Sequence, residues 1–221
     1  MNAELKQGIK ACRSFTDLRR LLAEVDSRSL GPRDIDLIYR TLRKCEEDAD
    51  LKLAYLGNHT LDPFARYVAA AALSEGIMVD EYIGAFGQHY QEVADPASAL
   101  VAFAPDVIFL TLSMKGLSPQ IRSQFMSLSR SDRQLELQRI LDHMRDWVDA
   151  TKQRLQGTIV ITNWPQPASP QAGIADAQLD FGECEFYLEL NLQFLRAFKD
   201  DPRVYVFDLD RALARCGTHD A

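Results

Sequence analysis

The chain has 221 residues, of which 47% are hydrophobic and 26% charged, and its formal net charge is −7. This composition is typical of a globular protein with one large domain or a domain plus an arm, and the negative charge argues against nucleic-acid binding. The N-terminus lacks an apolar signal segment and no apolar run approaches the ~18 residues of a membrane span, so we expect a cytoplasmic protein without a membrane partner.

Residues 1–50 have the pattern of a helical arm. Apolar residues recur at helical spacing on both sides of a break at 30–32: Leu18, Leu21, Leu22 and Val25 before it, and Ile35, Leu37, Ile38 and Leu42 after it. The acidic run at 46–48 resembles a hinge. We therefore expect two or three helices in an arm over residues 1–50, followed by a second domain over residues 51–221.

From residue 51 onward, strand and helix patterns alternate. Strands are expected at Leu51–Leu56, Ile77–Ile83, Asp106–Leu112, Thr158–Thr162 and Arg203–Phe207. Helical patterns lie between them, at 64–74, 98–103, 119–156 and 181–197. Strands that alternate with helices pair in parallel through right-handed crossovers. The predicted fold is a three-layer α/β/α sandwich with a parallel, five-stranded, doubly wound sheet of flavodoxin-like type.

The loop after the first strand is the most site-like segment of the chain. Ligands of such sheets bind beyond the carboxyl ends of the strands, where Gly57, Asn58, His59 and Thr60 follow at once. Asn58, Ser113 and Asn163 should converge with His59, because they follow strands one, three and four. The predicted binding residues are Gly57, Asn58, His59, Thr60, Gly87, Gln88, Ser113, Asn163 and Asp208.

Several of these segments together resemble a known family. The stretch Gly57–Thr60 is similar to the Gly-Asp-Ser block of SGNH (GDSL-type) hydrolases. In their order and spacing, five segments resemble the N-terminal SGNH-like domain of FkbH-like proteins: Leu56–Thr60, Gly87–Glu92, Ala104–Ile108, Thr162–Pro165 and Val206–Asp210. The resemblance covers roughly residues 50–215 and implies an SGNH-type fold for the second domain.

The resemblance also implies a function. In FkbH-like proteins of polyketide and other natural-product biosynthesis, such a domain precedes a phosphatase-like domain of the haloacid dehalogenase (HAD) superfamily. Full-length relatives transfer a glyceryl unit to an acyl carrier protein, and the phosphatase-like half carries that chemistry. This domain is therefore expected to bind the phosphopantetheinylated acyl carrier protein, or its glyceryl- or acyl-loaded arm, beside a HAD partner domain in cis.

The hydrolase set of the SGNH family is broken in this chain. His59 stands at the nucleophile position, and Thr60 takes it if the register slips by one. At strand three, where the family places an oxyanion asparagine, Leu110–Met114 contain none, and no Asp-x-x-His occurs near His219. A non-hydrolytic binding domain is therefore expected. One alternative is a thioesterase or acyltransferase that uses Thr60 with His59 or His89 as base, and another is a structural domain that dimerises through the arm.

Two other features leave open interpretations. Residues Val204–Ala212 resemble the Asp-x-Asp-x-Thr/Val nucleophile loop of HAD enzymes, but the fifth position of this motif is Ala212 rather than Thr or Val. We therefore interpret Asp208 as a residue at the end of strand five that faces the same edge of the sheet as Asn58. Asp210 is interpreted as an N-cap or first-turn acid of the next helix. His89 fits structural packing, His143 fits a solvated or half-buried position on the long helix, and Trp164 would either line a pocket or fix its loop.

Charge and cysteine patterns complete the expectations. Residues 114–157 carry 8 basic and 5 acidic groups, and carrier proteins are acidic, so Arg122, Arg130, Arg133 and Arg139 are the candidates for carrier docking.

The four cysteines lie far apart without a CxxC pair, which favours free thiols over a zinc site or a disulfide framework. No metal and no cofactor is expected in this domain.

Overall fold

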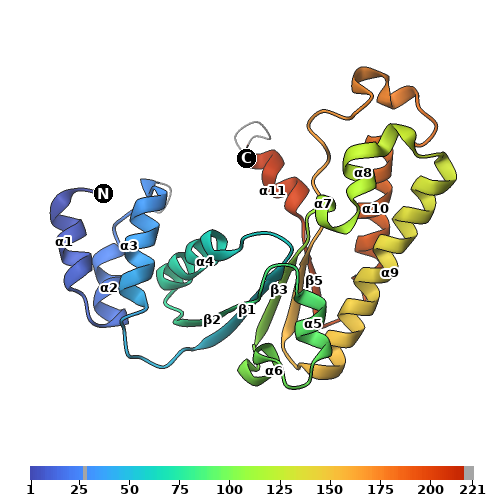
Figure 1. Ribbon diagram of the computed structural model, residues 1–221. Coiled ribbons are helices and arrows are strands. Elements are labelled where there is room, and N and C mark those ends of the chain that lie inside the picture. Colours follow the sequence, from blue (N-terminus) through green and yellow to red (C-terminus); the bar gives the residue numbers. More distant parts are fainter. Residues whose placement is uncertain (27–28, 217–221) are drawn as a thin grey trace.

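A computed structural model describes residues 1–26 and 29–216. Its sheet, in this part of the chain, consists of β1 (Leu51–Gly57), β2 (Val79–Ile83), β3 (Val107–Thr111), β4 (Thr158–Thr162) and β5 (Val204–Phe207). All neighbouring strands are parallel, and their order is β2-β1-β3-β4-β5. This is the flavodoxin-like order, with the reversal between β1 and β3. The predicted three-layer α/β/α architecture is confirmed (Figure 1).

Helices cover both faces of the sheet. One face carries α4 (Asp62–Glu75), backed by α1 (Ala3–Ala11), α2 (Phe15–Leu22) and α3 (Pro32–Leu42), as Figure 1 shows. The other face carries α5 (His89–Ala94), α9 (Arg130–Arg154) and α10 (Glu183–Phe198). The remaining short helices are α6 (Ala99–Phe103), α7 (Met114–Leu117), α8 (Pro119–Gln124) and α11 (Leu209–Cys216).

Strand β1 divides the apolar residues between two cores. Ala54 and Leu56 belong to the core beneath α9 and α10, whereas Leu53 and Tyr55 belong to the core beneath α4. This division follows from the alternation of side chains across a strand. Because both faces are covered, β1 is an apolar run rather than a polar–apolar alternation. The second core continues outward to Ile9 of α1, so the N-terminal helices share it with the sheet.

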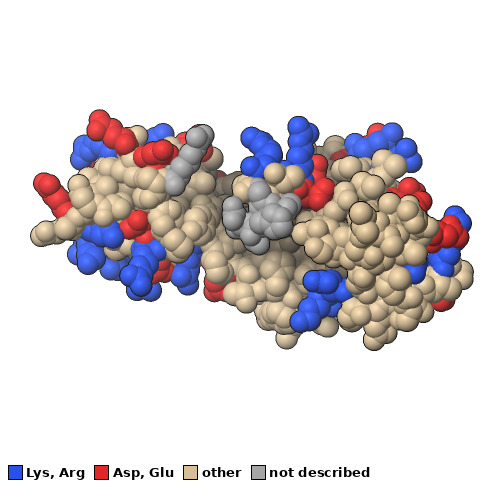
Figure 2. Space-filling model, turned by 90° about the horizontal axis from the view of Figure 1, so that it is seen from above, with Lys and Arg blue, Asp and Glu red and all other residues tan. Residues whose placement is uncertain are grey.

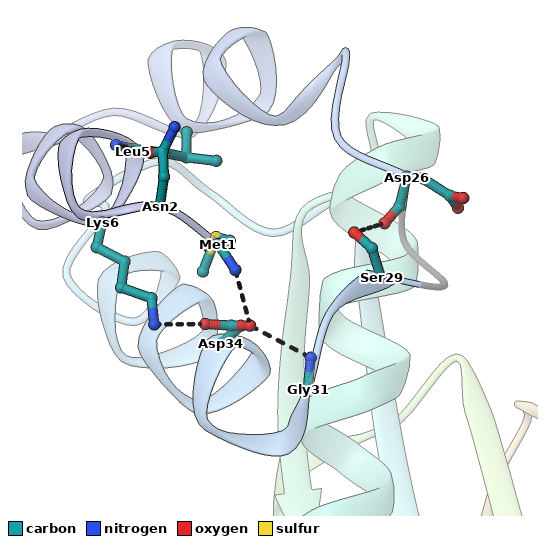
Figure 3. A network of polar contacts seen from close by, with 8 residues as sticks. All are labelled: Met1, Asn2, Leu5, Lys6, Asp26, Ser29, Gly31 and Asp34. Carbon is teal, nitrogen blue, oxygen red and sulfur yellow. Dashed lines mark hydrogen bonds and ion pairs between the residues drawn. The ribbon is translucent and has the colours of Figure 1, made fainter.

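An ion-pair network joins the first turn of α3 to the N-terminal segment (Figure 3). Asp34 Oδ1 lies 3.1 Å from Lys6 Nζ, and Oδ2 accepts hydrogen bonds from the Met1 amino group and the Gly31 N–H. The hydrogen bond from Lys6 holds the pKa of the Asp34 carboxyl below its usual range. The network fixes α1 against α3. The division of the chain into an arm and a second domain stays a prediction.

The long helix predicted over 119–156 is wrong in its first third. The structure has α8, then a 3₁₀ turn at Phe125–Ser127, and only then α9 from Arg130. Ser129 caps α9 through the Asp132 N–H, and the Asp132 carboxylate accepts the Ser129 N–H in return. This capping box satisfies N–H groups that a continuous helix would pair internally, and therefore favours a fresh start at this point.

Candidate functional site

Asn58 ties the ends of β1 and β3 together. Its Oδ1 accepts the Ser113 N–H at 2.8 Å, and its Nδ2 donates to the Ser113 carbonyl at 3.3 Å. Gly116 lies directly against this amide, since a Cβ at that position would stand 2.1 Å from Asn58 Nδ2. The Asn58 side chain, which was predicted to contact a ligand, thus uses its amide for hydrogen bonds within the protein. These bonds fix the loop that carries His59.

His59 and Thr60 follow Asn58 in the same loop, but they do not form a nucleophile and base. His59 Nδ1 is 3.4 Å from Asn58 Oδ1, and burial lowers the pKa of the imidazole. Among the residues that the structure describes, the Thr60 hydroxyl is hydrogen-bonded to no imidazole. General-base activation requires contact at about 3 Å, so the geometry of this state weighs against the Thr60 alternative.

The first cavity has a volume of about 750 Å³ and draws its lining from four segments. These are the loop after β1, the loop after β2 with α5, the segment after β3, and α9. Their lining residues are Asn58, His59 and Thr60; Phe86, Gly87 and His89; Ser113, Lys115, Gly116 and Leu117; and Arg139 and His143. The hollow lies at the carboxyl ends of the strands, the edge at which the sequence predicts a site.

His89 occupies this cavity as a neutral imidazole. Neither ring nitrogen has a hydrogen-bond partner among the described residues, although both are buried. Burial and then the neighbouring His143 lower the pKa of His89 to about 4. The backbone carbonyl of His89 accepts a hydrogen bond from the Trp147 indole at 3.0 Å, which anchors α5 to α9. His89 thus packs between α5 and α9, as the sequence favours, and it also lines the first cavity.

The depressed pKa of His89 predicts a loss of stability on mild acidification. In the unfolded chain this histidine takes up a proton near pH 6.5, but in the folded chain only near pH 4. The unfolded state therefore binds more protons in between, and the free energy of unfolding should fall from about pH 7 to about pH 5. The fall should be less than the ~2 kcal/mol that the full shift would give, because solvent screens this partly exposed residue. His59 and His143, whose pKa values are also lowered, act in the same direction.

Urea unfolding of the wild type and His89→Gln at several pH values tests this prediction. The free energy of unfolding of the variant should change less between about pH 7 and about pH 5 than that of the wild type. This range lies above the pKa of carboxyls such as Glu136, whose pKa is lowered by Arg139. Equal pH dependence in the two proteins would show that His89 is protonated in the folded state as easily as in the unfolded chain.

A second cavity of about 570 Å³ adjoins the first. His59, Ser113 and Lys115 line both cavities, so they form the ridge between them. The remaining lining of the second cavity is mainly apolar and includes Leu112, Met114, Trp164, Pro165, Pro167 and Tyr187. The two hollows together make an elongated cleft across the ends of β1, β3 and β4. Trp164 lines it and also fixes its loop, because its indole donates to the Leu112 carbonyl at 2.8 Å.

Asn163 and Asp208 connect the end of β4 to the start of α11. The Asn163 Nδ2 donates to Asp208 Oδ1 at 2.8 Å, and its Oδ1 accepts the N–H groups of Leu209 and Asp210. Asp208 also accepts the Arg211 N–H in the first turn of α11. Asn163 does line the second cavity, but its hydrogen-bonding groups are engaged. Both residues thus act as structural ties at the predicted site.

The predicted glycines and Gln88 differ in what they contact. Gly57 is needed for close packing, because a Cβ there would stand 2.6 Å from the Thr111 carbonyl oxygen. Gly87 has a positive φ of 71° and lines the first cavity, but its N–H donates to the Gly57 carbonyl at 2.9 Å. It is therefore not free to act as an oxyanion donor. Gln88 precedes α5 and is absent from the lining of both cavities.

The four arginines proposed for docking do not form one basic surface. Arg122 lines the second cavity, Arg139 lines the first, and Arg130 pairs with Asp180 at 2.6 Å. Figure 2 shows the Lys and Arg side chains in separate groups over the upper face rather than in a continuous stripe.

The docking role predicted for Arg133 is wrong. Its side chain is only 6% exposed, donates to the Phe181 carbonyl at 2.9 Å, and stacks on the Phe125 ring. A guanidinium buried in this way is not available to a partner protein.

Lys115, Phe86 and His143 are lining residues that the sequence prediction missed. A partial signal was present for one pair, since Arg139 and His143 are four residues apart and so lie on the same face of α9. Lys115 carried no signal beyond its place two residues after Ser113.

No cluster of three or more His, Cys, Asp or Glu suited to a metal ion occurs among the described residues. Within residues 1–26 and 29–216, no helix has both the length and the apolar character needed to cross a membrane.

Comparisons with known proteins give a structural neighbour. No family model and no curated protein matches the chain. Among solved structures, the chain is similar to the N-terminal part of the protein BF1531 from Bacteroides fragilis, which contains a phosphatase domain and is complexed with Mg. The TM-score is 0.63 at 18% identity, over 94% of this chain and 48% of that one. This chain thus spans about half the length of its neighbour, and at this identity the similarity supports the fold alone.

Proposed function

We propose that this chain is a non-hydrolytic, SGNH-like binding domain for the phosphopantetheine arm of an acyl carrier protein. The observation that carries the proposal is a long cleft at the strand ends in which, among the described residues that line it, no hydroxyl is paired with an imidazole. The amides that a hydrolase would aim at a substrate are used for holding loops together. Such a cleft retains the shape needed for an extended ligand and lacks the activated nucleophile needed to cleave it.

The proposal also assigns a context. By the resemblance to FkbH-like proteins, the domain would hold a glyceryl- or acyl-loaded carrier beside a HAD phosphatase-like domain in cis, in the cytoplasm, during polyketide or related biosynthesis. The structural neighbour is itself a chain that contains a phosphatase domain, and this chain matches 48% of it. That arrangement is compatible with the proposed pairing, since the domain would contribute binding and the partner domain chemistry.

Titration of the chain with an acyl carrier protein, in apo and in phosphopantetheinylated form, tests the proposal. At low salt the phosphopantetheinylated form should bind at least about tenfold more tightly than the apo form, because only it can fill the cleft. Arg122→Gln should weaken binding and its salt dependence, since Arg122 lines the second cavity. The exposed Arg196→Gln on α10 serves as the matched control. The proposal would be refuted if neither the apo form nor the phosphopantetheinylated form bound at low salt.

A further inference from the structure

The first cavity is lined by hydrogen-bond donors and cations, without a carboxylate. Lys115 and Arg139 supply two positive charges, and His59, His89 and His143 supply ring nitrogens. Neither Asp nor Glu is among the described residues that line it. In a chain whose formal net charge is −7, this hollow is locally positive, and such a lining favours an anion.

Two of these side chains have free donors. The Lys115 ammonium makes no ion pair or hydrogen bond with any residue that the structure describes. Arg139 is held in place by Glu136, at 2.8 Å from Nε and 2.6 Å from Nη2, and by the Leu117 carbonyl at 2.6 Å. Within the described residues its Nη1 has no acceptor. Glu136 offsets part of the Arg139 charge, so the unpaired Lys115 is the main cation of the cavity.

His59 and His89 add neither charge nor free donors to the lining. Each neutral imidazole carries one N–H, and that of His59 faces Asn58 Oδ1, which lies 3.4 Å from Nδ1. Both ring nitrogens of His89 are buried, so a ligand in the hollow does not reach them. Among the described lining residues, the free donors include the Lys115 ammonium, Nη1 of Arg139 and the Thr60 hydroxyl, which come from three separate segments and suit an anion with several acceptor oxygens. A phosphate group meets that requirement better than a carboxylate, which offers two oxygens.

We propose that this cavity binds a phosphate group between Lys115 and Arg139, with the Thr60 hydroxyl as a further donor. The remainder of the ligand crosses the ridge formed by Ser113 and enters the second, more apolar cavity. The assignment of this ligand rests on the function proposed above: the phosphate is that of the phosphopantetheine arm, and the pantetheine chain lies along Trp164. The acyl end of the arm is then placed away from Thr60, in keeping with a site that binds without cleaving.

Calorimetric titration with small ligands tests the phosphate site directly. The probes are 4′-phosphopantetheine, pantetheine, inorganic phosphate and glycerol phosphate. Phosphopantetheine should bind about tenfold more tightly than pantetheine, and inorganic phosphate should compete with it. Lys115→Gln should reduce the affinity for phosphopantetheine about tenfold and leave that for pantetheine unchanged. Lys199→Gln, at the end of α10 and outside the lining of both cavities, is the matched control.

The outcomes separate this inference from the proposed function. Equal binding of phosphopantetheine and pantetheine, or no greater loss for Lys115→Gln than for Lys199→Gln, would overturn the phosphate site even if the loaded carrier still binds. Binding of glycerol phosphate without binding of phosphopantetheine would support the phosphate site and overturn its assignment to a carrier arm. Failure of all four probes and of the carrier protein would overturn both proposals.

Discussion

Replacement of Trp147 by alanine is expected to lower the free energy of unfolding by about 4 kcal/mol. Trp147 is fully buried in the core between the sheet and α9. Its removal would leave a cavity in a close-packed region and also strip the His89 carbonyl of its hydrogen bond from the indole. The expected result in a urea titration is a large shift of the midpoint with little change in slope.

Two further variants show which part of the Trp147 effect belongs to packing. Trp147→Phe retains most of the apolar volume but cannot donate to His89, so it should cost about 1–2 kcal/mol. Leu135→Ala on the same helix is the control, because Leu135 is 71% exposed and alanine is a good helix former. A loss for Trp147→Ala no larger than that for Leu135→Ala would contradict the placement of the indole in the core.

Replacement of Asn163 by alanine is expected to cost about 3 kcal/mol. Asn163 is 3% exposed, and its amide makes three hydrogen bonds that hold α11 to the end of β4. Alanine would leave the N–H groups of Leu209 and Asp210 without that acceptor. The measurement is again urea unfolding, with Asn2→Ala as the control, since Asn2 caps the exposed start of α1 and should cost about 1 kcal/mol.

Asn163→Asp provides a sharper test of the same contact. The new carboxylate keeps the acceptor function but would face the Asp208 carboxylate at the present hydrogen-bond distance of 2.8 Å. Repulsion raises the folded-state pKa of the pair, so the destabilisation relative to wild type should be largest near neutral pH and shrink as the pH falls toward about 5. A destabilisation independent of pH would mean that residue 163 does not contact Asp208.

Much of the fold could be predicted, because short apolar runs that alternate with helical patterns favour the buried strands of a parallel sheet. The predicted Thr158–Thr162 coincides with β4, and β1, β3 and β5 differ from their predicted spans by a residue at one or both ends. Strand β2 begins at Val79 rather than at Ile77, since Ile77 still belongs to the turn after α4 that Gly76 closes. The residue pattern therefore predicted the strands and their parallel pairing, but not the residues at which each turn begins and ends.

The positions of the candidate residues at the strand ends could be predicted from the strand pattern, but their hydrogen-bond partners could not. Polar residues at strand ends were expected to face a ligand, yet Asn58 and Asn163 bond to neighbouring loops, because buried backbone groups at these ends need partners. The docking prediction for Arg133 was wrong because it assumed that a charged side chain is exposed. The spacing of four between Arg133 and Leu137 places Arg133 on the buried stripe of α9, and this register would have corrected the prediction.

The measurement that most directly tests binding without cleavage is intact mass spectrometry of an acyl-loaded carrier protein incubated with this chain. It is made at concentrations at which the titration shows the carrier to be bound. The proposed function predicts that the acyl mass is retained at the rate seen without the chain. Loss of the acyl mass that Thr60→Ala abolishes would contradict it and identify the chain as a hydrolase or transferase.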